Sequence, residues 1–328
     1  GYGKYDLSNI NIKANLDKGS LTAQADCDNK AIKGNVGISA LLSALHLGEG
    51  DKHGSTVMLT ANLSHIDLQK LHVIDEATTV SVHGQVDATT DFDKLYKVQG
   101  HFSDIAVSNG KKELHPNDVT LDLLTNHDTT KVIADCNDFH LNLHSSGGYE
   151  KLMKAIVPFI NEMQRQLKDR YIDQERLRRR LPQLKVSLQT NSDNFFAQIL
   201  HHYGIDFKSI NMDVESSPST GINGYAKAMG LVVDSMALDT ARLDMSSAQK
   251  DMTYRLELHN GSKSQLPFHA LVDGAITEHG TWIKPRVYDA KGRLGVGLSL
   301  MAEMKRDGIN VSMFGDKPIL GYKEFEVN

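Results

Sequence analysis

Histidine is the residue of this sequence that most readily suggests metal chemistry, because the chain contains 15 of them. His140 and His144 are four residues apart in an alternating segment, which would place them about 13 Å apart on one face of a strand. That separation is too long for one metal ion. His201 and His202 are adjacent in an expected short helix, so their side chains diverge. The motifs His-Glu-x-x-His and Cys-x-x-Cys are absent from the sequence. We therefore expect solvent-facing histidines and no metal site.

Carboxylates are the second candidate for chemistry, and most of them fall in expected turns and at strand ends. A glycosidase needs two carboxylates that face each other in a cleft. The sequence does not exclude such a pair. The nucleophile elbow Gly-x-Ser-x-Gly and the phosphate-binding Gly-x-x-x-x-Gly-Lys-Ser/Thr loop are both absent. We therefore expect no enzyme and no cofactor. The clustered carboxylates are Asp26, Asp28, Asp87, Asp91, Asp93, Asp135 and Asp138.

A run of arginines is the sharpest charge feature of the chain. Arg176, Arg178, Arg179 and Arg180 follow one another with a single leucine between the first two. These side chains are candidates for contacts with anionic lipid headgroups or a partner. They also lie where the last turns of a helix are expected, and cations there complement the helix dipole. Both roles stay open from sequence.

The arginine run closes the one long segment that is patterned as a helix, from Gly148 to Leu181. Its apolar residues recur at steps of three and four, which predicts one helix face. Pro158 predicts a kink or a later start, and Pro182 predicts the end. An unbroken helix would be about 30 residues, roughly 45 Å long. The predicted face comprises Leu152, Ile156, Phe159, Ile160, Met163, Leu167 and Tyr171.

Alternating apolar and polar residues predict β-strands on both sides of this helix. Ile10 to Leu16 and Leu21 to Cys27 alternate around the turn Asp17–Ser20, which predicts a hairpin with one apolar face. Residues 38–47 fit a short helix or a buried strand. A second, short helix is expected from Asp193 to Tyr203, capped by Ser192 or Asp193 and ended by Gly204. Pro285 predicts an edge strand or a bend at Trp282–Val287.

Composition agrees with a globular β protein. The chain has 328 residues, of which 40% are hydrophobic and 23% charged, and its net charge of −5 gives no support for nucleic-acid binding. Cys27 and Cys136 lie in alternating segments and are expected as buried or half-buried thiols, with a disulfide as the alternative. The sequence begins at Gly1 and contains no apolar run long enough to span a membrane, so we expect a section of a longer protein.

Several stretches resemble the AsmA-like and TamB superfamily of large envelope proteins, most closely versions from Bacteroides-type bacteria. The density of apolar alternation with few prolines adds to the resemblance. This family offers no catalytic residues, so none is transferred. The stretches that carry the resemblance are Asp6–Asp17, Ala61–Leu68, Gly84–Asp87, Asp193–Phe196 and Gly204–Phe207.

The resemblance implies a periplasmic location, within a longer protein anchored at the inner membrane. Such proteins have curled antiparallel sheets that form an open apolar groove, or half-pipe. They are implicated in moving phospholipid to the outer membrane and in outer-membrane protein assembly. For this chain it implies a mainly β fold with one long amphipathic helix and one or two short helices. We expect an N-terminal β segment (1–146), the helix (147–182) and a C-terminal β segment (183–328), which can be continuous with the first.

The working hypothesis is a non-enzymatic segment that binds lipid acyl chains along this groove. The helix face of Leu152, Ile156, Phe159, Met163 and Leu167 would either close a stretch of the groove or pack on a sheet as an ordinary helix. The alternative hypothesis is an extracellular, glycan-binding or adhesive β module, although Trp282 is the single tryptophan. A hydrolase with paired carboxylates is the third. The groove candidates are Leu184, Val186, Leu188, Ile210, Met212, Val214, Leu256, Leu258, Leu298 and Leu300.

Overall fold

The protein is mainly β: in the computed structural model, 63% of the chain is strand and 12% helix. The strands form one large antiparallel sheet that is not closed. The prediction of a mainly β antiparallel fold is therefore confirmed. The structure describes residues 8–41, 55–73, 75, 77–91, 93–110, 113–169, 172–233, 236–247, 251–261, 267–278, 280–305 and 308–326.

The chain divides into two compact units. The first comprises residues 1–142 and 193–199, and the second comprises residues 143–192 and 200–328, so the helical segment belongs to the second unit. In the first unit each strand pairs with the next along the chain, except that β8 joins β6 beside the short β7. Its strands are β1 (Ile10–Asp17), β2 (Ser20–Asp28), β3 (Ile32–Leu41), β4 (Ser55–Asp67), β5 (Thr79–Thr90), β6 (Tyr96–Ser108), β7 (Glu113–Leu114), β8 (Val119–Thr125) and β9 (Thr129–Cys136), while β10 (Phe139–Ser146) extends into the range of the second.

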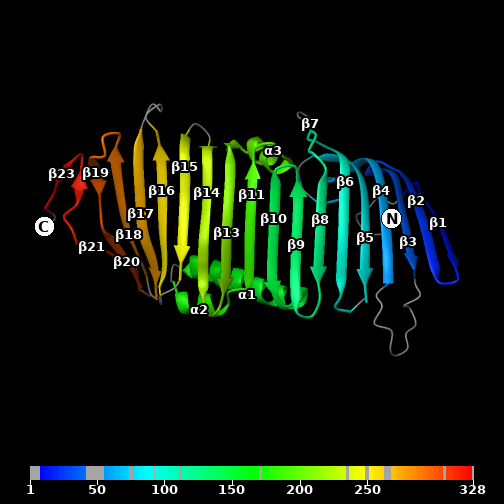
Figure 1. The fold of residues 1–328 in the computed structure, drawn as a ribbon, viewed down its shortest axis with the longest axis horizontal. Helices are drawn as coiled ribbons and strands as arrows, with labels where there is room; N and C mark the ends of the chain where they lie inside the picture. The colour runs from blue at the N-terminus through cyan, green and yellow to red at the C-terminus, as the bar shows by residue number, and fades with distance from the viewer. Residues whose placement is uncertain are drawn as a thin grey trace. The chain divides into compact units, whose positions relative to one another are not determined.

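The second unit is also an antiparallel meander, in which β13 to β18 pair in chain order and β11 lies beside β13. Figure 1 shows these strands running side by side, with α1 and α2 beside one end of them. Its elements are α1 (Tyr149–Asp169), α2 (Gln174–Arg179), β11 (Leu184–Asn191), β12 (Ile205–Asp206), β13 (Ser209–Ser217), β14 (Gly221–Val233), β15 (Met236–Ser246), β16 (Met252–Asn260), β17 (Phe268–Thr277), β18 (Gly280–Asp289), β19 (Leu294–Gly297), β20 (Leu300–Lys305), β21 (Gly308–Met313), β22 (Ile319–Leu320) and β23 (Lys323–Glu324).

The first hairpin illustrates how local sequence sets strand register. Lys18 and Gly19 both have positive φ, 47° and 81°, which is the geometry of a two-residue type I′ turn. This turn places Asp17 opposite Ser20 and Leu16 opposite Leu21. The predicted hairpin is therefore confirmed. Of the ambiguous stretch 38–47, residues 38–41 are strand in β3, and the rest lies outside the described residues.

The long helical segment differs from its prediction. The sequence predicts one helix from Gly148 to Leu181, but α1 ends at Asp169 and the separate α2 begins at Gln174. Asp173 is the physical reason, because its carboxylate accepts a hydrogen bond from Arg176 N and caps a new helix. Pro158 lies inside α1, so a helix that starts only at that residue is also wrong. Tyr171 lies outside the described residues.

The short helix α3 (Phe195–His202) is confirmed, with a different cap. Asn194, not Ser192 or Asp193, accepts the hydrogen bond from Ala197 N at 2.9 Å. Its side-chain amide also donates to Asp138, so the cap is held from outside the helix. Gly204 has a φ of 78° and provides the expected left-handed end.

Pro285 corrects the prediction of an edge strand. It lies inside β18, which pairs with β17 on one side and with both β19 and β20 on the other. On that second side, Ile283 pairs with Leu300 of β20 and Arg286 with Gly297 of β19, so Pro285 falls where the partner changes. A missing amide donor costs little at such a break.

One aromatic ring lies over two glycines in the first unit. Gly84 is opposite Phe102 across the β5–β6 pair, and Gly100 is two residues before Phe102 on the same face. A Cβ atom at Gly84 or Gly100 would come within 2.8 or 2.9 Å of the ring. An aromatic side chain that covers glycine in this way restores the apolar contact that glycine lacks.

We predict that Gly100→Ala lowers the free energy of unfolding by about 1 kcal/mol, because the new methyl group overpacks against Phe102. Urea denaturation followed by circular dichroism measures this change. Gly308→Ala is the matched control, since a Cβ atom there meets nothing within 4 Å. An effect of Gly100→Ala no larger than that of the control would contradict the packing of Phe102 over Gly100.

Candidate functional site

The sheet of the second unit has one apolar face that runs across successive strands. Cross-strand neighbours on this face form rows, and the rows are almost wholly apolar. The first row is Val186, Val214, Gly224, Met245, Tyr254, Gly274, Ile283, Leu300 and Met313. The second is Leu188, Met212, Ala226, Leu243, Leu256, Val272 and Pro285. The third is Thr190, Ile210, Ala228, Ala241, Leu258, Ala270, Val287 and Val296.

The opposite face of the same strands is charged. Arg242 and Asp244 form a bidentate ion pair on β15, with N–O distances of 2.8 and 2.6 Å. Asp273 of β17 pairs with Arg255 on one neighbouring strand and with Arg286 on the other. Burial raises the pKa of Asp273, but these two guanidinium groups outweigh it and hold that pKa below its usual value. The alternation of the sequence therefore separates a wet face from an apolar face.

The apolar face is only partly covered. Nearly all the side chains in the three rows are half-buried, and among the described residues the fully buried apolar side chains of this unit are few. Across seven strands at about 4.8 Å and along six residues at about 3.3 Å each, the face measures roughly 600 Å². The apolar side chains of this face are therefore partly open to contacts from outside their own sheet.

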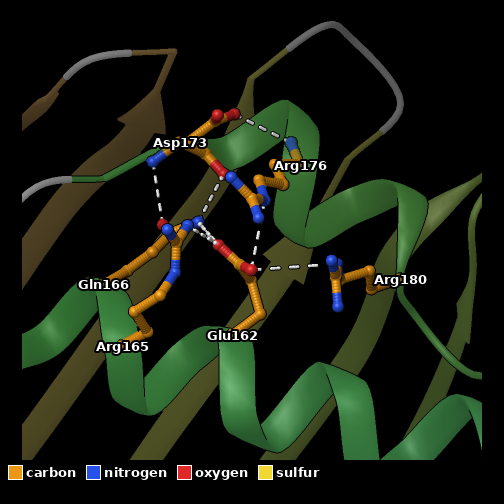
Figure 2. A network of polar contacts seen from close by, with 6 residues as sticks. All are labelled: Glu162, Arg165, Gln166, Asp173, Arg176 and Arg180. Carbon is orange, nitrogen blue, oxygen red and sulfur yellow. Dashed lines mark hydrogen bonds and ion pairs between the residues drawn. The ribbon is translucent and has the colours of Figure 1, made fainter.

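The helices α1 and α2 cover one end of this face, and a polar network fastens them together (Figure 2). Glu162 of α1 is 3% exposed, and its Oε1 accepts hydrogen bonds from Arg165 at 2.5 Å and Gln166 at 2.9 Å. Its Oε2 pairs with Arg176 at 3.1 Å and with Arg180 at 3.8 Å. The carboxylate thus joins α1 to both ends of α2.

Gln166 completes this network and fixes the start of α2. Its amide oxygen accepts from Asp173 N at 2.8 Å, and its amide nitrogen donates to Asp173 O at 3.2 Å. Burial raises the pKa of Glu162, but hydrogen bonds from Gln166 and Arg165 and the charges of Arg165 and Arg176 outweigh it. The pKa of Glu162 therefore lies below its ordinary value, and the carboxylate is ionised near neutral pH.

An apolar cavity of about 470 Å³ lies between this helix pair and the strand ends. From the helices it is lined by Phe159, Met163 and Leu167 of α1, by Leu177 of α2, and by Leu181. The sheet contributes the ends of β14, β16, β17, β20 and β21 through Ile222, Met252, Ile276, Met304 and Ile309. These residues lie on the apolar face, so the cavity is the covered end of that face. Its volume is in the range of small-molecule sites.

The buried side of α1 differs from the predicted face. Leu152 is buried as expected, but Glu162 and Gln166 are buried with it. Ile160, Met163 and Leu167 are 40%, 40% and 72% exposed. The sequence did not reveal this rotation, because an acidic residue is normally assigned to the solvent side. Glu162 can be buried because Arg176 and Arg180, which follow in and after α2, pair with its carboxylate.

The four predicted headgroup arginines all have partners within the chain. Arg176 and Arg180 pair with Glu162, and Arg179 pairs with Glu175 at 3.2 Å. Arg178 donates to the carbonyl oxygens of Pro218 and Ser219 in the turn between β13 and β14. Their predicted contact with lipid headgroups stays a prediction.

Nine of the ten groove candidates lie in strands of the second unit, on one face. Val186 is opposite Val214, Leu188 is opposite Met212, and Leu184 is next in line on β11. Leu256 and Leu258 occupy the second and third rows, and Leu300 the first. Leu298 lies in the break between β19 and β20, where its amide donates to Pro285. Their role in lipid binding stays a prediction. Sequence reasoning missed Leu177 and Leu181, whose only signal was their position among the arginines.

Other candidate groups are engaged in ordinary surface contacts. His140 pairs with Asp135 and His201 with Asp206, and no group of three or more metal-ligating side chains is found among the described residues. Trp282 packs edge-on against Phe314, and Lys284 lies over both rings. Cys27 and Cys136 carry free thiols. Within the described part of the chain, no helix has the length and hydropathy to cross a bilayer.

Comparisons with known protein families, with curated proteins and with solved structures found no match to this chain. The apolar face, the cavity and the helix pair are therefore the features that bear on function.

Proposed function

We propose that this chain is a non-enzymatic periplasmic section that holds or conducts phospholipid acyl chains along an apolar β-groove. The observation that carries the proposal is the half-buried apolar face of the second unit, which continues into the apolar cavity under α1 and α2. Anchoring within a longer inner-membrane protein and contacts with outer-membrane assembly proteins belong to the same proposal. They rest on the resemblance to AsmA-like and TamB proteins.

Acyl chains suit this face because they are apolar, flexible and long. Each methylene group removed from water contributes about 0.8 kcal/mol, so a stretch of ten would contribute about 8 kcal/mol. This is comparable with the cost of association. A chain lying across the rows of Val214, Leu243 and Leu256 would meet side chains of similar polarity on adjoining strands. The interaction requires no directional partner, which is compatible with movement along the face.

The helix pair acts in this proposal as a cover over one end of the groove. Met163 and Leu167 line the cavity while remaining 40% and 72% exposed, so they stand at its mouth. The charged network around Glu162 holds the cover in position. This agrees with the interpretation in which the helix closes a stretch of groove.

The proposal predicts that the protein purified from a diderm bacterium carries phospholipid, detected by mass spectrometry of an organic extract. A photo-crosslinking amino acid at Val186, on the apolar face, should form a covalent adduct with that lipid. The matched control is the same amino acid at Lys185, the adjacent exposed residue that pairs with Asp213 on the opposite face. Equal lipid adducts at Val186 and Lys185, or protein free of lipid at both, would contradict the proposal.

A further inference from the structure

Helix α1 also carries an exposed apolar surface, beyond the side chains that it buries against the sheet and α2. Met153, Val157, Ile160, Met163 and Leu167 are exposed by 37%, 47%, 40%, 40% and 72%, and Tyr149 at the start of the helix by 58%. At 100° per residue these six side chains fall within about 120° of the helix circumference. They form a continuous exposed stripe of two and a half heptads, which we call the α1 stripe.

Basic residues flank the α1 stripe. Lys154 and Lys168 are exposed on one side of it. The ion pair of Lys154 with Glu150 is solvent-exposed, so Glu150 holds this cation only weakly. A hollow of about 340 Å³, lined by Lys151, Arg179 and Arg180, lies on the other side of α1, about 180° around the helix from the middle of the stripe.

The charge of the helical segment is opposite to that of the chain. Residues 149–181 contain nine lysines and arginines and five aspartates and glutamates, whereas the net charge of the whole chain is −5. An exposed apolar stripe flanked by cations is the pattern of helices that lie in the plane of a membrane interface. Phosphate groups of anionic lipids complement the cations, while the apolar side chains enter the acyl boundary.

We propose that the α1 stripe docks this protein on the surface of a bilayer that contains anionic phospholipid. This goes beyond the groove proposed above and does not require it, since Met153, Val157 and Ile160 of the stripe lie outside the cavity lining. Met163 and Leu167 belong to both the stripe and the cavity lining, so a docked bilayer lies against the mouth of the cavity. The stripe thereby gives the groove a place to exchange lipid.

Sedimentation with vesicles tests this proposal. The intact protein should bind vesicles of phosphatidylcholine with 30 mol% phosphatidylglycerol much more tightly than vesicles of phosphatidylcholine alone, and added salt should weaken that binding. The double variant Lys154→Gln/Lys168→Gln should lose about fivefold in affinity per lysine. Lys185→Gln, on the charged face of the sheet, is the matched control and should bind as the original protein does.

The apolar part is tested by Val157→Asp, which should abolish vesicle binding. Val157 is 47% exposed and does not line the cavity, so the variant should fold, as circular dichroism will show. Val73→Asp is its control, because Val73 is 64% exposed and lies outside both α1 and the rows of the apolar face. Equal loss in both variants, or binding indifferent to phosphatidylglycerol, would overturn the proposal. So would a dimer in light scattering that Val157→Asp converts to monomer without changing vesicle binding. Phospholipid retained by a Val157→Asp protein that no longer binds vesicles would separate docking from the groove.

Discussion

Replacing Glu162 by alanine should lower the free energy of unfolding by about 2 kcal/mol and detach α2 from α1. The carboxylate is 3% exposed and joins Arg165 on its own helix to Arg176 and Arg180. Hydrogen bonds to charged groups are each worth about 1.5 to 3 kcal/mol. Since the arginines are 39% to 49% exposed and can rehydrate, the loss stays well below the sum of three such bonds.

Guanidinium denaturation monitored by circular dichroism measures the stability of this variant, and hydrogen exchange of residues 174–180 measures detachment of α2. Glu150→Ala is the matched control on the same helix, because Glu150 is 80% exposed and its ion pair with Lys154 lies at the solvent-exposed surface. That pair should contribute less than about 0.5 kcal/mol. A Glu162→Ala protein as stable as Glu150→Ala, with α2 still protected, would show that the network does not hold the helices together.

The same carboxylate should make the packing of α2 against α1 sensitive to acid. The pKa of Glu162 in the folded protein is lower than that of an unfolded glutamate, about 4.3. The contribution of Glu162 to the free energy of unfolding is therefore fully present above about pH 4.3, and it is lost as the pH falls through the lowered pKa of the folded protein. The difference in stability between the original protein and Glu162→Ala should accordingly shrink below pH 4. A difference that grows on acidification would contradict a lowered pKa.

The strands could be predicted from sequence because their signal is local. Alternation between Leu184 and Leu188, or between Leu256 and Leu258, determines which side chains share a face before any partner strand is known. The hairpin turn at Lys18 and Gly19 is equally local. Register across strands then follows from keeping the apolar residues on one side, and it brings Val186 opposite Val214 as that rule requires.

The helix pair could not be predicted in the same way, because its determinants are distant in sequence. Glu162 is buried only because Arg176 and Arg180 turn back toward it. That reversal depends on Asp173, whose capping role is invisible in a pattern that continues helically through Leu177 and Leu181. The cavity depends on the reversal in turn, since those two leucines line it only when α2 lies beside α1. The site is therefore a tertiary feature, while the face beneath it is a local one.

A charge placed in the middle of the apolar face should distinguish an open groove from a sealed core. Leu256 lies in the second row, opposite Leu243 and Val272, and is half-buried. In a closed core Leu256→Asp would cost more than about 4 kcal/mol, because an unpaired carboxylate would lose its hydration. On an open face the carboxylate keeps water, so the loss should be about 1 to 2 kcal/mol, from the apolar contact that is removed.

Two measurements on Leu256→Asp distinguish these cases. Denaturant unfolding gives the stability, and mass spectrometry gives the amount of phospholipid that co-purifies. The groove predicts a folded, moderately destabilised protein that has lost most of its lipid, because a charge now interrupts the path between Leu243 and Val272. Thr253→Asp, at an exposed position of the same strand, should leave both quantities unchanged. An unfolded Leu256→Asp protein would mean that the face is sealed, and a folded one with undiminished lipid would mean that the acyl chains lie elsewhere.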